Sequence, residues 1–153
     1  MHWYLQSFQD LANEALYDIM KARQEVFIIE QNCNYLDADG KDIHSLHLTL
    51  KIENQIAAYA RIVPAGISYE EVSIGRVLTT KNFRRKNYGR QLMSQALETI
   101  EQLYGKVPVK IGAQQYLKTF YEGFGFIQQG EMYLEDDIPH IYMMRTALIQ
   151  NQE

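Results

Sequence analysis

The strongest constraint on the fold is an alternation of apolar and polar residues that runs through residues 46–52 and again through 56–62. Side chains on a strand point to opposite faces in turn, so this pattern predicts two strands that each bury one face. Glu53-Asn54-Gln55 separates the two stretches and supplies a turn. The segment therefore predicts a hairpin, whose strands must pair antiparallel.

Helical and strand-like patterns flank this hairpin. Apolar residues recur near a period of 3.6 in residues 9–29 and 88–104, which predicts two helices. Residues 32–42 are polar and rich in turn-forming residues, which predicts a loop. We also expect strands at residues 2–8, 72–79, 107–113, 126–134 and 140–147, and a short helix at 116–123. The order is strand, helix, three strands, helix, strand, helix, two strands, which predicts an α/β or α+β fold with a mixed sheet.

Size and composition favour a small cytoplasmic domain. A chain of 153 residues ordinarily forms one domain around a single core, so residues 1–153 are expected to be one unit. The net charge of −4 argues against binding to nucleic acid, and the apolar stretch 26–29 is too short to span a membrane. Residues 1–6 do not resemble a signal peptide. The single cysteine, Cys33, excludes an intrachain disulfide and is expected to be a small buried residue.

A basic segment lies just before the second long predicted helix. Its charged residues are Arg84, Arg85, Lys86 and Arg90. A helix that starts behind such a loop presents free backbone N–H groups and the positive end of its dipole. Residues 84–90 therefore predict a cradle for a pyrophosphate, with a solvated basic helix start as the alternative. A P-loop is excluded because no Gly-Lys-Ser/Thr ends the segment, and a dinucleotide fingerprint because its glycines are missing.

An acidic segment, Asp37-Ala38-Asp39-Gly40-Lys41-Asp42, lies in the predicted loop. It lacks the register and the distal glutamate of an EF-hand, so a calcium site is not expected. A solvated turn is the favoured interpretation. If the acids have a function, they could attract a cationic amine.

These motifs, in this order, resemble the GNAT superfamily of acetyl-coenzyme A-dependent N-acetyltransferases, and within it the ElaA-like branch. Residues 84–89 resemble the superfamily's Arg/Gln-x-x-Gly-x-Gly/Ala loop, with Asn87 in place of the first glycine. Asparagine tolerates left-handed backbone conformations, so we expect the loop to keep its shape. Residues 110–114 and 120–126 resemble the strand and the Phe-Tyr-x-x-x-Gly-Phe ending. The ElaA-like features are Arg23-x-x-Val26-Phe27, Glu30-Gln31-Asn32-Cys33, the 37–42 loop, Ile74-Gly75-Arg76-Val77 and Ile138-Pro139-His140-Ile141.

The resemblance implies a mostly antiparallel sheet that splays between its fourth and fifth strands, with the pantetheine arm of acetyl-coenzyme A in the gap. The residues it implies for the cosubstrate are Val77, Leu78, Thr79, Arg84, Arg85, Lys86, Asn87, Tyr88, Gly89, Arg90 and Gln114. It also places Tyr121 beside the coenzyme sulfur. A phenol is protonated at neutral pH, so Tyr121 could protonate the leaving thiolate as a general acid.

Transfer to nitrogen also requires a neutral amine, so a base should remove a proton from the acceptor. We rank Glu30 and His140 together as candidates, followed by His47. Backbone N–H groups near Val77 or Leu78 could polarise the thioester carbonyl. The expected acceptor is an amine of a small molecule, peptide or protein, and the final strands could support a homodimer. The alternative function is a non-catalytic sensor or regulatory subunit that binds acyl-coenzyme A.

Overall fold

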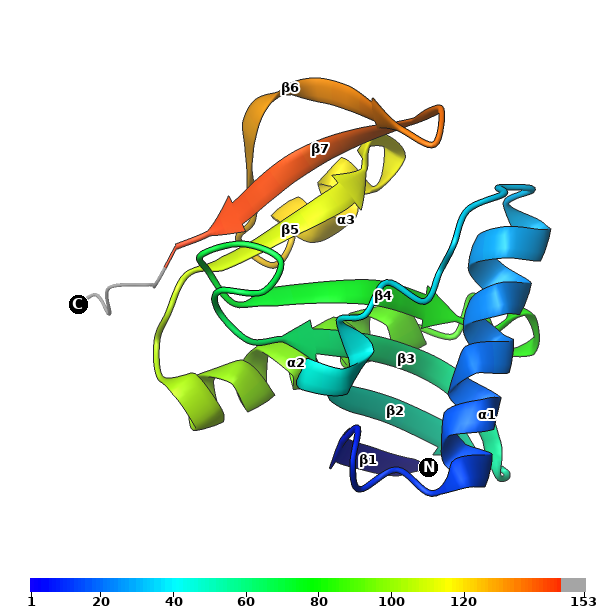
Figure 1. Cartoon of the computed structure of the whole chain (residues 1–153). Coiled ribbons are helices and arrows are strands. Elements are labelled where there is room, and N and C mark those ends of the chain that lie inside the picture. Colours follow the sequence, from blue (N-terminus) through cyan, green and yellow to red (C-terminus); the bar gives the residue numbers. More distant parts are fainter. Residues whose placement is uncertain (147–153) are drawn as a thin grey trace.

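The computed structural model describes residues 1–146, which form two antiparallel sheets and three α-helices (Figure 1). The elements are β1 (His2–Ser7), α1 (Asn13–Arg23), β2 (Leu46–Ile52), β3 (Gln55–Val63), β4 (Ser73–Thr79), α2 (Tyr88–Tyr104), β5 (Val109–Gln114), α3 (Lys118–Glu122), β6 (Ile127–Glu135) and β7 (Ile138–Arg145). The predicted order of strands and helices is confirmed. The predicted end of the last strand, Ala147, lies outside the described residues. Within residues 1–146, no helix has the length and apolar character needed to cross a membrane.

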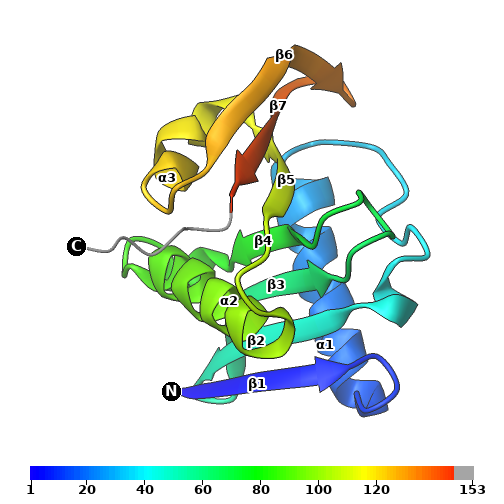
Figure 2. The same ribbon diagram turned by 90° about the vertical axis from the view of Figure 1, so that its left-hand side faces the viewer.

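The first sheet has the strand order β1-β2-β3-β4 and contains the predicted hairpin. Ile52 pairs with Gln55, and the two residues between them, Glu53 and Asn54, have φ angles of 52° and 64°. Two positive φ angles in a two-residue loop are typical of a type I′ turn, whose twist matches that of the flanking strands. Helices α1 and α2 cover opposite faces of this sheet (Figure 2).

A bulge in β4 reverses which face its side chains occupy. Leu78 pairs with Tyr59 of β3 and packs with it on the α1 side, whereas Ile74 pairs with Ile62 and packs on the α2 side. In a regular strand, residues four apart share one face. The register slips because Arg76 and Val77 lie opposite a single residue of β3. Arg76 has a φ of 51°, so the bulge is built on a left-handed residue that is not glycine.

The second sheet has the order β5-β7-β6, and it separates from the first beside β4. Val72 and Val109 form a parallel bridge, in which the N–H of Lys110 donates to the carbonyl of Val72 at 2.9 Å. Beyond this point β4 and β5 are assigned to different sheets and diverge (Figure 1). The predicted splay between the fourth and fifth strands is therefore confirmed.

Two predictions around the first helix need correction. The segment expected to be one helix over 9–29 becomes helical only at Asn13, is a regular α-helix to Arg23 and continues as a π-helix, Gln24–Glu30. The wider turns persist past its end, because the N–H of Cys33 donates to the carbonyl of Ile28. The solvated turn expected at residues 37–42 is wrong, since Asp37 and Asp42 are only 8% and 6% exposed.

Candidate active site

A cavity of about 300 Å³ opens where the two sheets separate. Its walls come from β4, β5, β7, α3, the turn between β6 and β7, and the loop that follows the π-helix. Four of the residues predicted for catalysis or cosubstrate binding line it: Val77, Gln114, Tyr121 and His140. The structure thus brings together the predicted acid, one predicted base and the bulged strand.

Tyr121 presents a protonated phenol to this cavity. The residue is 6% exposed, and its ring meets Phe120 and Phe126 edge-on at centroid distances of 5.1 and 6.0 Å. Among residues 1–146 no hydrogen-bond partner engages its hydroxyl. Burial, with a smaller contribution from Tyr116, raises the pKa of Tyr121. The hydroxyl therefore keeps its proton at neutral pH and can donate it within the cavity.

His140 offers a basic nitrogen to the same space. Its Nδ1 lies 2.7 Å from the carbonyl oxygen of Ile138, and because a carbonyl only accepts, Nδ1 must carry the hydrogen. In the neutral ring the proton-accepting nitrogen is then Nε2. The ring lies 5.8 Å from that of Tyr133, which limits its rotation. His140 is therefore oriented as a proton acceptor by its own strand.

Glu30 and His47, the other two candidate bases, do not line the cavity. Glu30 ends the π-helix and forms an ion pair of 2.5 Å with Nη2 of Arg84. His47 is 1% exposed: its Nε2 donates to the carbonyl of Asp42 at 3.0 Å, and its Nδ1 accepts from the hydroxyl of Tyr59 at 2.7 Å. Burial lowers the pKa of His47, so the ring is neutral and enclosed.

The basic segment 84–90 is exposed apart from half-buried residues 88 and 89, and it leads directly into α2. Asn87 has a φ of 69°, the left-handed conformation expected for a residue that replaces glycine there. The N–H of Gln91 donates to the carbonyl of Asn87, so the amides of residues 88–90 have no acceptor within the helix. Nε of Arg84 donates to the carbonyl of Thr79 at the end of β4. This helix start can therefore receive an anion.

Cys33 lines the cavity as a protonated thiol. It is 9% exposed, which agrees with the expectation of a small buried residue. Burial, followed by the negative charges of Asp136 and Asp137, raises the pKa of its thiol. Because the thiolate is the reactive form of cysteine, this environment does not favour a covalent acyl-cysteine.

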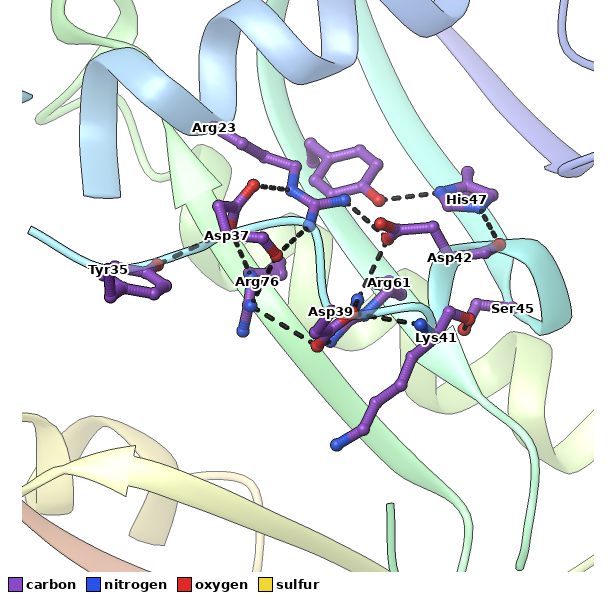
Figure 3. Close-up of polar contacts among 11 residues, drawn as sticks. Arg23, Tyr35, Asp37, Asp39, Lys41, Asp42, Ser45, His47, Arg61 and Arg76 are labelled. Carbon is purple, nitrogen blue, oxygen red and sulfur yellow. Dashed lines mark hydrogen bonds and ion pairs between the residues drawn. The ribbon is translucent and has the colours of Figure 1, made fainter. Parts of the chain in front are cut away.

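Beside the cavity lies a network of three arginines and three aspartates that sequence reasoning missed (Figure 3). It joins Arg23 of α1, Arg61 of β3 and Arg76 of β4 to Asp37, Asp39 and Asp42 of the loop. One signal was present in the sequence: Arg61 is a single charge in the apolar stretch 56–63. The three acids therefore bind arginines, and no group of three or more His, Cys, Asp and Glu within residues 1–146 is arranged to hold a metal ion.

Comparisons with known proteins agree with this architecture. Residues 8–147 match the model of the acetyltransferase (GNAT) domain. The chain is 39% identical to protein ElaA of Escherichia coli K12 over 150 residues, which cover 97% of this chain and 98% of ElaA. Among solved structures, an acyl-CoA N-acyltransferase from Pseudomonas aeruginosa has a TM-score of 0.90 at 38% identity, covering 95% of this chain and 100% of that one. E. coli ElaA has a TM-score of 0.88 at 41% identity, covering 95% and 99%.

A more distant structure, an aminoglycoside 6′-N-acetyltransferase complexed with coenzyme A, has a TM-score of 0.70 over 97% of this chain and 99% of that one. At 13% identity it shows a likeness of fold alone. The match to the domain model and the identity to ElaA each span nearly the whole chain. On these grounds the chain belongs to the acetyltransferase (GNAT) domain family.

Proposed function

We propose that this protein is an acetyl-coenzyme A-dependent N-acetyltransferase, and that residues 1–153 act as a single domain. The observation that carries the proposal is the cavity at the split between the sheets, where the free hydroxyl of Tyr121 and the oriented ring of His140 face one space. Acyl transfer to nitrogen requires a proton acceptor for the amine, a proton donor for the leaving thiolate, and backbone N–H groups that stabilise the carbonyl oxygen. The cavity offers the first two in its side chains and the third at the bulge of β4.

Acetyl-coenzyme A would bind in an extended form across two sites. The pantetheine arm would lie along the open edge of β4, where residues 77–79 have no partner strand on the β5 side among the described elements. The pyrophosphate would bind at residues 84–90, where helix amides and arginine side chains are exposed. On the opposite wall, the side chain of Gln114, whose Nε2 donates to Oε1 of Gln31 at 3.3 Å, is close enough to the cavity to contact the arm.

The reaction would proceed by direct attack. Nε2 of His140 takes a proton from the acceptor ammonium, directly or through water, and the amine nitrogen forms a bond to the thioester carbon. Negative charge collects on the carbonyl oxygen, where backbone amides at the β4 bulge can stabilise it. The carbon–sulfur bond then breaks, and the hydroxyl of Tyr121 donates its proton to the leaving sulfur. The acylated nitrogen releases its second proton, which restores the phenol of Tyr121, and His140 passes the first proton to solvent. The protonated thiol of Cys33 supports this route over one through an acyl-cysteine.

The charges around the cavity favour a cationic amine as the acceptor. Glu135, the last residue of β6, and Asp136, in the turn that follows, line the cavity and form no ion pair within residues 1–146. Of the lysines and arginines that line the cavity, Arg76 is paired, whereas Lys41, on the facing loop, forms no ion pair within residues 1–146. The cavity is thus lined by two unpaired carboxylates and one unpaired ammonium, so the electrostatic potential there is negative. A negative potential attracts a positively charged acceptor.

The test is release of free thiol from acetyl-coenzyme A across a panel of diamines, neutral-headed amines and peptides. We expect turnover with cationic acceptors, and a loss of about a hundredfold or more in Tyr121→Phe and His140→Gln, the typical contribution of a general acid or base. Glu98→Gln, on an exposed part of α2, is the matched control and should behave as wild type. Binding of acetyl-coenzyme A without thiol release for any acceptor would support the non-catalytic sensor instead.

A further inference from the structure

We propose that the Asp37–Arg76 pair is a positioning clamp for catalysis, which holds the β4 bulge so that its amides face the reacting carbonyl. Neither residue is proposed to touch the acetyl group. The inference rests on the proposed function, because it assigns the clamp to the same cavity.

The clamp begins with the backbone of Arg76. A left-handed φ of 51° is unfavourable for a residue with a long side chain, so some contact must offset its cost. The guanidinium supplies that contact: Nε donates to Oδ1 of Asp37 at 2.7 Å, and Nη2 donates to the carbonyl of Asp37 at 3.0 Å (Figure 3). One residue therefore supplies both the strained backbone of the bulge and the side chain that holds it.

Asp37 is in turn fixed from the other side by α1. Nε of Arg23 donates to the second carboxylate oxygen, Oδ2, at 2.9 Å, and Nη2 of Arg23 donates to the carbonyl of Asp37 at 3.3 Å. Arg23 is completely buried and also donates to Oδ1 of Asp42 at 2.6 Å. Both carboxylate oxygens of Asp37 are therefore occupied, one by the helix and one by the bulge.

The rest of the network ties the loop to β3. Nη1 of Arg61 donates to Asp39 at 2.8 Å and to Asp42 at 2.9 Å, while Nη2 reaches the second oxygen of Asp39 at 2.9 Å. Burial would raise the pKa of Asp39, but its hydrogen bonds to Arg61 and to the backbone of Lys41 outweigh burial and lower it. Asp39 therefore stays ionised and bound to Arg61, and the network holds the loop that supplies one wall of the cavity.

A positioning role explains why charges are used here. A buried ion network seldom adds net stability over apolar packing, because desolvation offsets the attraction. Every element that this network joins (the end of α1, the loop, β3 and β4) either lines the cavity or supports a strand that does. The hydrogen bonds within its salt bridges have fixed directions, which apolar contacts lack. They can therefore hold the backbone of the bulge in the exact position that stabilisation of a transition state requires.

The test compares kcat with KM at a temperature well below the unfolding midpoint of each variant. We expect Asp37→Asn and Arg76→Gln to lower kcat by about 10- to 100-fold, as misplacement by about 1 Å does, with KM for acetyl-coenzyme A within about twofold. Arg76→Gly tolerates the left-handed backbone but lacks the clamp, so it should lose kcat too. The double variant Asp37→Asn/Arg76→Gln should be less slow than the product of the two single effects, because both substitutions remove the Asp37–Arg76 contact.

The control is Ile100→Ala. Ile100 is buried on α2 and forms no part of the ion network, and its truncation should lower the melting temperature by leaving a cavity. This variant should keep the wild-type kcat. Hydrogen exchange adds a readout that needs no turnover: amides of residues 73–79 should exchange faster in Asp37→Asn, while those of 88–104 should not. Unchanged kcat and unchanged exchange in folded Asp37→Asn would overturn the clamp. If wild-type protein transfers no acetyl group, the proposed function fails, and the exchange measurement still decides on the clamp.

Discussion

Replacing Arg23 by methionine should lower the free energy of unfolding by about 3–5 kcal/mol, the range seen when one partner of a buried ion pair is removed. Arg23 is completely buried, and its three hydrogen bonds all end on Asp37 or Asp42. Methionine fills a similar volume, so a cavity contributes little to the loss. The dominant cost is that two buried carboxylates lose a cation, although Arg61 and Arg76 remain bound to them. Those remaining partners keep the expected loss near this range, below the sum of three charged hydrogen bonds.

The measurement is urea and thermal unfolding followed by circular dichroism. For a chain of this length each kcal/mol lowers the melting temperature by about 2–4 °C, so Arg23→Met should melt about 6–20 °C below wild type. Lys21→Met is the matched control, since Lys21 lies two residues earlier on the same helix and is exposed. It should stay within about 0.5 kcal/mol of wild type. If Arg23→Met were as stable as this control, the reasoning about uncompensated buried charge would be refuted.

Three further predictions concern ligand and pH. Acetyl-coenzyme A should raise the melting temperature, and replacing both Arg84 and Arg90 by alanine should largely abolish that rise; an unchanged rise would move the pyrophosphate site elsewhere. Glu30→Gln should tighten acetyl-coenzyme A binding in calorimetry while keeping kcat, because Glu30 competes for Arg84; a large loss of kcat would restore Glu30 as the base. The free energy of unfolding should fall as the pH drops below about 6.5, because the unfolded chain protonates His47 there and the folded one does not. It should fall again below about 3.9, because the unfolded chain protonates Asp39 and Asp42 before the folded one does. Urea titrations from pH 8 to 3 would show this, and a flat profile would contradict it.

The elements that sequence analysis predicted well are those whose signal is local. The hairpin at 46–62 and the helix at 88–104 each carry a clear periodicity of apolar residues. This periodicity predicts each element from its own residues, without knowledge of the segments that pack against it. The left-handed Asn87 is local in the same sense, because its residue type alone tolerates that backbone. Local signals therefore found the hairpin at the centre of the first sheet and the start of the helix that carries the basic segment.

The misassigned residues depend on contacts between distant segments. Asp37 pairs with arginines 14 and 39 positions away, and nothing in the acidic segment says which arginines approach it. The sequence makes Glu30 a candidate base because it ends the first helical region, but it does not show that the distant Arg84 approaches this end. The carboxylate of Glu30 pairs with Arg84 and does not line the cavity.

The β4 bulge combines a local backbone feature with a contact between distant segments of the chain. Strict alternation would put residues 74 and 78 on one face, yet the slip at Arg76 and Val77 sends them to opposite faces. A bulge of this kind usually carries a residue for which the left-handed region is inexpensive, and arginine is not one. The side chain explains why arginine stands here. The backbone of Arg76 adopts the unfavourable left-handed conformation, and its guanidinium binds Asp37 and so holds the strand in place. The strain and the buried ion network are thus one feature of this fold, located where β4 faces the cavity.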